Sequence, residues 1–127
     1  MAELEKSLNA VLHCIPKMLQ AAIDRGGNQY TFDYIVEQVI SGKMHLWNCD
    51  DAIGITQFIN YENARYLHGL FAAGNLESIV ENLTPQAENF GRRNHCDVFS
   101  ISGRSGWAKV FASHGWVEKF RILEKKL

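Results

Sequence analysis

The sequence predicts a mixed α/β (α+β) fold, and three successive stretches of differently spaced apolar residues support that prediction. Apolar side chains recur at helical spacing near the start, alternate with a period of two from residue 44, and return to helical spacing from residue 76. Shorter runs of both kinds follow, which gives the order α-α-β-β-β-α-β-α-β. We therefore expect a mixed, mostly antiparallel central sheet flanked by helices.

The composition is that of one globular domain, and we expect it to cover residues 1–127. The 127 residues are 46% apolar and 21% charged, so the chain can bury a core without disulfides or a metal. Its three cysteines are odd in number and widely spaced, which predicts reduced thiols and no metal site. The absence of a long apolar run and of a basic leader predicts a cytoplasmic protein with no membrane partner.

The first helical pattern runs over residues 4–24, where Pro16 either kinks one helix or occupies the first turn of a second. Thr31 then caps a helix that ends at Ser41-Gly42. The buried positions expected in this second helix are Phe32, Ile35, Val36, Val39 and Ile40.

Three antiparallel strands, joined by polar turns at residues 48–51 and 60–63, are predicted next. Their alternating positions are Met44, Leu46, Ile53, Ile55, Tyr66, His68 and Leu70. The helix that starts at Leu76 either continues past Thr84-Pro85 or is followed there by a second helix.

In the last part of the chain, the spacing of apolar residues predicts a strand at residues 97–102, a helix at 105–114 and a final strand at 116–123. Because a helix separates the strand at 97–102 from the strand at 64–72, we expect these two strands to be parallel or to share a right-handed crossover.

Charge is distributed unevenly along the chain. Residues 1–63 carry a balance of −4 and residues 64–127 a balance of +3, with a net charge of −1. The small net charge argues against nucleic-acid binding, and any anionic ligand is expected to meet the second half.

A junction between a strand and a helix is the best candidate for a binding site. The strand that ends at residues 70–72 runs through small residues directly into a helix, whose first amides and dipole favour an anion. In the alternative interpretation, Gly74 only makes a tight turn and Asn75 caps the helix. The candidate residues are Leu70, Phe71, Ala72, Ala73, Gly74, Asn75 and Leu76.

A second strand-to-helix junction, at residues 102–107, contains Arg104 between two glycines. Its guanidinium could bind a second anionic group if the two junctions meet at one edge of the sheet. In the alternative interpretation, the glycines shape a turn and Arg104 is solvated.

The order of elements, the segment Leu70-Phe71-Ala72-Ala73-Gly74 before a helix and the closing His114-Gly115-Trp116 resemble the GNAT N-acetyltransferase superfamily, most closely its short, phage-encoded members. The specific part of this resemblance consists of residues 27–33, 41–47 and 103–107. The first strand usual in that superfamily has no counterpart, since the chain opens with a helix.

The resemblance implies acyl transfer from acetyl-CoA to a small-molecule or protein amine, in a cleft where two strands splay apart. It places the pantetheine of CoA along Leu70, Phe71 and Ala72, and the pyrophosphate at the amides of residues 73–77. A homodimer is compatible with this interpretation.

Several positions depart from the family pattern. Only Ala73-Gly74-Asn75-Leu76 stands where the superfamily has its pyrophosphate signature, and Phe111 stands where a tyrosine acid is common. Glu62 and His68 are the candidates for a general base. These departures support an alternative from another class, a non-catalytic phage structural, assembly or host-interaction protein that retains the fold.

Overall fold

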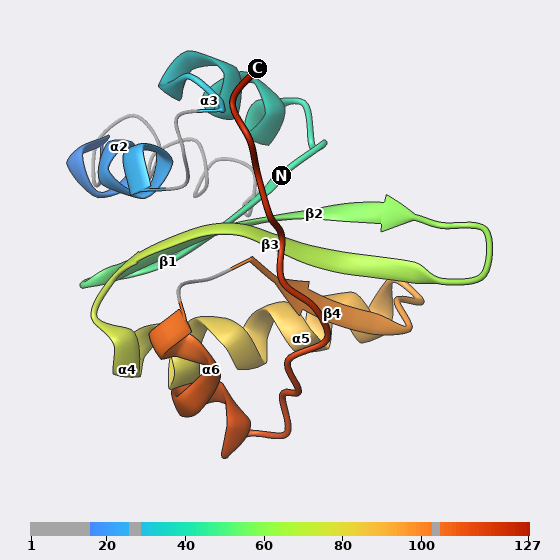
Figure 1. The fold of residues 1–127 in the computed structure, drawn as a ribbon. Helices are drawn as coiled ribbons and strands as arrows, with labels where there is room; N and C mark the ends of the chain where they lie inside the picture. The colour runs from blue at the N-terminus through green and yellow to red at the C-terminus, as the bar shows by residue number, and fades with distance from the viewer. Residues whose placement is uncertain (1–15, 26–28, 103–104) are drawn as a thin grey trace.

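A four-stranded mixed sheet with helices on both faces forms the centre of the molecule (Figure 1). The computed structural model describes residues 16–25, 29–102 and 105–127. The strands are β1 (His45–Cys49), β2 (Ala52–Asn60), β3 (Arg65–Gly74) and β4 (Val98–Ile101), and they lie side by side in chain order. The first three are antiparallel and β4 is parallel to β3, so the predicted fold class and the predicted parallel pair are confirmed.

Two helices, α2 (Pro16–Arg25) and α3 (Phe32–Ile40), cover one face of the sheet (Figure 1). The predicted helical residues 4–15 lie outside the described residues. Thr31 caps α3 as predicted, because its hydroxyl oxygen accepts a hydrogen bond from the Tyr34 amide over 3.2 Å. The core on this face consists of Leu19, Ala22, Ile23, Ile35, Val39, Met44, Leu46, Ile53, Ile55 and Ala73.

The prediction that Ile40 is buried is wrong, since its side chain is 47% exposed. At 3.6 residues per turn, Ile40 lies about 140° around the helix from Ile35, which faces the core. An apolar residue in the last turn of a short helix can therefore continue the sequence pattern while pointing away from the sheet.

The opposite face is covered by one long helical run and by α6 (Ser105–Ala112). The run comprises α4 (Leu76–Ser78), a π-helical segment η2 (Ile79–Leu83) and α5 (Thr84–Arg93). Pro85 has no amide hydrogen, and its ring would clash in a regular α-helix. The π-turn accommodates it, and the Thr84 hydroxyl donates to the Ile79 carbonyl over 2.7 Å. The helix therefore continues past Thr84-Pro85.

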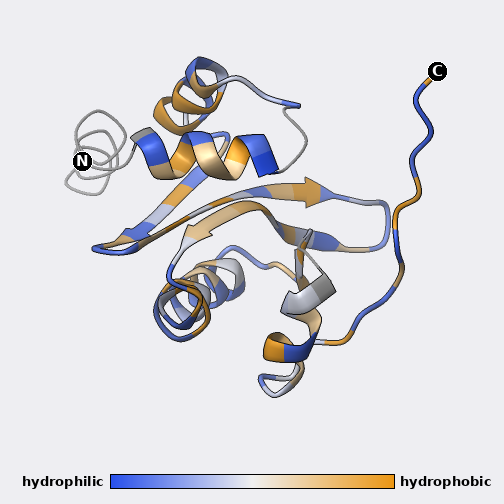
Figure 2. Ribbon diagram, turned by 60° about the vertical axis from the view of Figure 1, so that its left-hand side comes forward, coloured by the Kyte–Doolittle hydropathy of each residue, from blue (hydrophilic) through white to orange (hydrophobic). Residues whose placement is uncertain are grey.

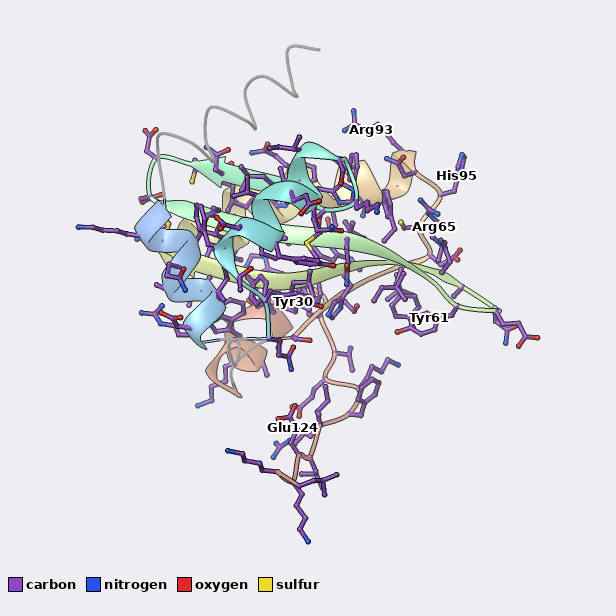
Figure 3. All side chains as sticks on the ribbon, turned by 90° about the horizontal axis from the view of Figure 1, so that it is seen from above. Tyr30, Tyr61, Arg65, Arg93, His95 and Glu124 are labelled. Carbon is purple, nitrogen blue, oxygen red and sulfur yellow. The ribbon has the colours of Figure 1, made fainter. Side chains whose placement is uncertain are left out.

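The predicted final strand at residues 116–123 is wrong. Trp116 packs against Phe99 and Phe111, with ring centroids 4.9 and 5.2 Å apart, but the chain after it pairs with no strand of the described residues. This segment extends away from the sheet (Figures 2 and 3, Glu124). Its exposed apolar side chains are Val117, Phe120, Ile122, Leu123 and Leu127. Alternating apolar residues favour a strand, but a strand forms only where another strand accepts its hydrogen bonds.

Among the described helices, none is long and apolar enough to cross a membrane.

Candidate functional site

A β-bulge interrupts β3 near its middle. Ile55 of β2 pairs with Phe71 and the next residue, Thr56, pairs with Gly69, so Leu70 is an extra residue in β3. A bulge bends its strand and increases the local twist. The second half of β3 is therefore turned relative to the first.

The pairing of β3 with β4 ends at this bulge, where β4 itself ends. Their parallel pairing runs from Tyr66↔Val98 to Gly69↔Ile101, and the Ser102 amide makes a last hydrogen bond of 3.3 Å to the Gly69 carbonyl. Beyond that point, β3 continues to Gly74 with no strand of the described chain on its outer edge. We call this arrangement the fork.

Gly69 is required at the base of the fork by close packing. A Cβ atom at this position would lie 2.9 Å from Cγ2 of Ile101, so the Ile101 side chain would have to shift to admit a larger residue. The strands thus approach closely up to Gly69, where their pairing ends.

The open part of β3 offers backbone groups between apolar side chains. Leu70 and Phe71 pack partly against the core beneath α2 and α3, whereas Ala72 belongs to the core on the other face. An unpaired strand edge can accept an extended chain that carries amide groups, as a further strand would do.

A cleft of about 200 Å³ lies at the far end of this open edge. Its lining includes four of the seven residues predicted from the strand-to-helix junction, Ala72, Ala73, Gly74 and Leu76. The cleft is completed by Ile79, by Trp107 of α6 and by Arg25 at the end of α2. Arg25 carries no sequence signal for this role, because only the tertiary fold brings α2 to β3.

The backbone that surrounds Gly74 explains why a glycine occupies this position. Its φ is +105°, and a Cβ atom would lie 2.1 Å from the carbonyl oxygen of Asp51. The Asn75 amide donates to that same carbonyl over 2.8 Å. The interpretation of Gly74 as the residue of a tight connection is therefore confirmed.

The first turn of the helix after Gly74 contains backbone amides that donate to no acceptor among the described residues. The Asn75 side chain caps the helix by accepting from the Ser78 amide over 3.0 Å. No described residue accepts a hydrogen bond from the amides of Leu76 or Glu77. These two donors lie at the positive end of the helix dipole, although the Glu77 carboxylate adds a negative charge in the same turn.

A polar cluster lies at the base of the fork. The His68 Nδ1 atom is 2.7 Å from the Ser100 hydroxyl oxygen, and its Nε2 atom is 3.2 Å from the Ser102 hydroxyl oxygen. Burial lowers the pKa of His68 below its usual 6.5, so the imidazole is neutral at pH 7. The two serines are functional candidates that the sequence did not reveal, since their signal depends on the pairing of β4 with β3.

The strand pattern places this cluster on the face that carries α2 and α3. Leu67 points toward α5, where a Cβ atom at Gly91 would lie 3.3 Å from it. Because neighbouring residues in a strand face opposite sides, His68 points the other way. Its partners across the sheet are Gln57 and Ser100.

Two other predicted residues, among those that the structure describes, are not brought to the cleft. Glu62 is exposed in the β2–β3 turn, at the opposite end of β3 from the cleft. Phe111, only 3% exposed, packs against Trp107 and Trp116 and belongs to the core. Arg104 lies outside the described residues.

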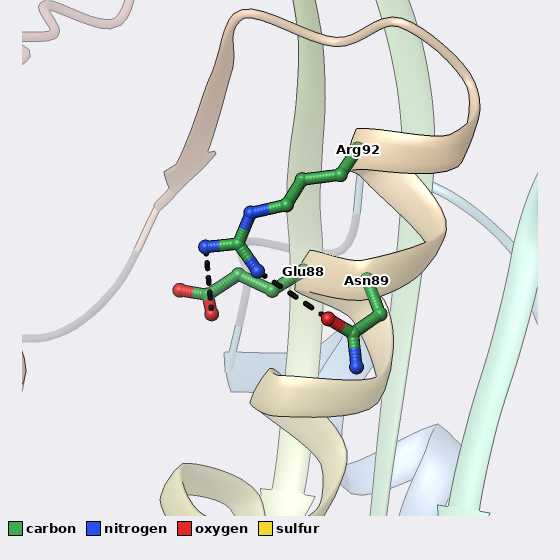
Figure 4. A network of polar contacts seen from close by, with 3 residues as sticks. All are labelled: Glu88, Asn89 and Arg92. Atoms are coloured by element: carbon green, nitrogen blue, oxygen red, sulfur yellow. Dashed lines mark hydrogen bonds and ion pairs between the residues drawn. The ribbon is translucent and has the colours of Figure 1, made fainter.

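A wider surface hollow of about 560 Å³ lies between Trp47 and the polar side of α5. Arg92, which contributes to its wall, is held by Asn89 over 3.3 Å and lies 3.7 Å from the Glu88 carboxylate (Figure 4). This hollow contains none of the predicted site residues. The described residues also contain no group of three or more side chains that could hold a metal ion.

Comparison with solved structures identifies the fold. A GNAT family acetyltransferase from Staphylococcus aureus matches with a TM-score of 0.57 at 15% identity, over 99% of this chain and 93% of that chain. The aminoglycoside N-acetyltransferase AAC(6')-Iy, solved in complex with CoA, matches with a TM-score of 0.61 at 13% identity, over 94% of this chain and 89% of that chain. A transcriptional regulator from Bacillus halodurans matches with a TM-score of 0.61 at 9% identity, over 99% of this chain and 94% of that chain.

The chain therefore has the GNAT acetyltransferase fold, at low sequence identity to these structures. By sequence, it matches no family model and no curated protein. The three solved structures are not described as phage proteins, so the predicted phage origin gains no support. The regulator among them illustrates that this fold is not tied to one function.

Proposed function

We propose that the protein transfers an acyl group, such as the acetyl group of acetyl-CoA, to a primary amine. The fork between β3 and β4 is the observation that supports this proposal most strongly. It combines an open strand edge, a cleft at the end of that edge and a histidine at its base. The solved acetyltransferase AAC(6')-Iy, whose fold is similar, is in complex with CoA.

The open edge of β3 suits the pantetheine arm of CoA. That arm is extended and carries two amide groups, so it can pair with the backbone of Leu70–Ala72 as an added strand would. The residues of this stretch are apolar and only half-buried, which allows a thin ligand to lie against them.

The cleft at the end of β3 suits the pyrophosphate. Its volume of about 200 Å³ is below the roughly 300–1,000 Å³ of a complete drug-sized site, so it fits a diphosphate rather than a whole nucleotide. The Arg25 guanidinium supplies a positive charge there, and the amides of Leu76 and Glu77 supply donors. Arg104, at the second strand-to-helix junction, remains a candidate for another phosphate contact.

The chain contributes position and proton transfer to the reaction. When bound, the CoA thioester supplies an activated acyl carbon. Binding at the fork would hold that carbon close to an amine on the face that carries His68. The neutral His68 imidazole accepts the proton that the amine loses. Phe111 supplies no acid, because it has no exchangeable proton and is buried.

A thermal-shift titration tests this function. CoA and acetyl-CoA are expected to raise the Tm with increasing concentration, since a ligand of the native state stabilises it. Arg25→Ala is expected to weaken CoA binding about tenfold, the effect of losing one charge-assisted contact. Lys17→Ala, which removes another exposed charge from α2, is the matched control and should bind CoA as the wild type does.

The alternative function is non-catalytic, a structural, assembly or host-interaction role that retains the fold. Two observations favour it. The close approach of the Asp51 carbonyl is enough to require a glycine at position 74, without any ligand. The tyrosine acid expected from the resemblance is replaced by the buried Phe111. If millimolar CoA leaves the Tm unchanged, the transferase proposal is wrong and this alternative is preferred.

A further inference from the structure

The surface hollow beside β1 lies outside the fork and has no part in the proposed function. It measures about 560 Å³, which is within the roughly 300–1,000 Å³ of small-molecule sites. One wall is Trp47 of the edge strand β1. The other wall is one face of α5, because its lining residues recur at spacings of three and four. They are Gln86, Asn89, Arg92 and Arg93.

Trp47 offers the hollow a flat ring that is held in place. Its indole Nε1–H donates to the buried Thr56 hydroxyl over 2.8 Å. The Phe90 ring packs edge-on against it, with ring centroids 5.2 Å apart. Because Trp47 is only half-buried, part of the indole is accessible to a second flat ring in the hollow.

The two amide side chains of the α5 wall keep one acceptor and one donor free. Gln86 Nε2 donates to the Asn82 side-chain oxygen, and no described residue donates to Gln86 Oε1. Asn89 Oδ1 accepts from Arg92 over 3.3 Å, and no acceptor in the described chain takes a hydrogen bond from Asn89 Nδ2 (Figure 4). An acceptor and a donor three residues apart on one helix face match the edge of a heterocycle such as adenine, which offers both kinds of group.

The two arginines give the same wall a positive charge. Arg92 lies 3.7 Å from the Glu88 carboxylate, which offsets its charge. Arg93 forms neither an ion pair nor a side-chain hydrogen bond with any part of the chain that the structure describes. A guanidinium is planar and presents several N–H donors, so the free Arg93 side chain suits a phosphate group.

We propose that this hollow is a second binding site, for a small ligand that joins a flat heterocycle to a phosphate, as a purine nucleotide does. The heterocycle lies against Trp47, with its polar edge toward Gln86 and Asn89. The phosphate lies at Arg93. The described lining of the hollow shares no residue with that of the cleft at the end of β3, so the inference does not depend on acyl transfer.

Isothermal titration calorimetry with adenosine monophosphate (AMP) tests the site. AMP should bind at least about tenfold more tightly than adenosine or inorganic phosphate alone, because both ends of the ligand make contacts. Gln86→Glu should weaken AMP binding at least about tenfold, since a carboxylate in the hollow repels the phosphate, and Arg93→Ala should weaken it about tenfold. Both positions are exposed, so both variants should fold. In a nitrogen–proton NMR spectrum, AMP should also shift the Trp47 indole signal, which Trp47→Phe identifies by its absence.

The matched controls are Gln29→Glu and Lys109→Ala. Each changes the net charge as the test variants do, at an exposed position that does not line the hollow. Lys109 also lies in the last turn of its helix, as Arg93 does. Both controls should bind AMP with the wild-type affinity.

Three results would overturn the inference. Millimolar AMP that releases no heat and leaves the Trp47 signal in place would show that the hollow binds no nucleotide. Affinity that falls in Arg25→Ala but not in Gln86→Glu would place AMP in the cleft at the end of β3, and the proposed function would still stand. If Arg93→Ala lowers the Tm without weakening AMP binding, Arg93 only compensates the helix dipole at the end of α5. AMP binding that Gln86→Glu weakens and Arg25→Ala does not would support the site, whatever the outcome for acyl transfer.

Discussion

The two halves of β3 belong to one strand but differ in their surroundings. From Arg65 to Gly69, the strand pairs with β2 on one side and with β4 on the other. From Phe71 to Gly74, it pairs with β2 and has no described strand on its outer edge. The bulge at Leu70 separates the two halves.

This difference shows how one strand can serve both stability and binding. The first half has its backbone groups satisfied and is tied further by the Asp97 carboxylate, which accepts from the Arg65 amide over 2.9 Å. The second half presents unpaired backbone groups that a ligand can satisfy. A sheet that paired along its full length would be more regular but would have no place for an extended ligand.

The largest effect is expected at the end of the open half, for Gly74→Ala. The added Cβ would lie 2.1 Å from the Asp51 carbonyl oxygen, at a φ of +105° that alanine avoids. We expect the free energy of unfolding to fall by about 4 kcal/mol or more. Urea unfolding followed by circular dichroism measures this change.

Gly42→Ala is the control that measures the cost of a positive φ without a steric contact. Gly42 has a φ of +79°, but a Cβ there would meet nothing within 4 Å, so we expect a loss of about 1–2 kcal/mol. Equal losses at both positions would show that the close contact with Asp51 is unimportant. The turn would then be free to rearrange around a ligand.

A smaller effect is expected at the base of the fork, for Gly69→Ala. The new Cβ would lie 2.9 Å from Cγ2 of Ile101, and overpacking of this kind costs about 2 kcal/mol. Gly54→Ala, where the nearest atom would be 3.7 Å away, should change the stability by about 0.5 kcal/mol or less. A Gly69→Ala variant as stable as Gly54→Ala would mean that β4 is not tightly held at this point.

The smallest effect is expected for the dependence of the free energy of unfolding on pH. It compares His45 and His68, which lie on opposite faces of the sheet. Burial, and secondly the positive charge of Arg65, lower the pKa of His45 from 6.5 to about 4. Between pH 6.5 and 4, the unfolded chain binds more protons than the folded one, so the free energy of unfolding falls as the pH falls. With solvent screening, we expect a loss of about 1–2 kcal/mol.

Urea unfolding at pH 7 and at pH 4.5 measures this dependence. His45→Gln should remove most of it, because glutamine does not titrate in this range. The remaining slope is assigned to His68, whose pKa is shifted in the same direction by burial. An unchanged slope in His45→Gln would contradict the assignment to His45.

Much of the fold could be predicted because local patterns and tertiary packing agree. The Thr31 cap, the three antiparallel strands and the parallel strand after a crossover helix all follow from spacing and turn residues. The prediction of a final strand is wrong for the opposite reason. Residues 116–123 have a strand-like pattern, but no described strand accepts their hydrogen bonds.

The candidate site could be predicted only in part. The strand-to-helix junction was visible in the sequence, because small residues between a strand and a helix have a local signature. The bulge at Leu70, the Arg25 side chain in the cleft and the serines beside His68 were not visible. Each of these depends on which segments lie next to one another.

By itself, the sequence determined the class of fold, the order of most elements and the junction at Gly74, since these depend on periodicity and on the conformational freedom of single residues. The tertiary structure alone decided where the pairing of β3 with β4 ends, which charged residue lines the cleft and which hydroxyls contact the imidazole. These features arise from contacts between segments that are distant in the chain, and a one-residue change of register would remove them.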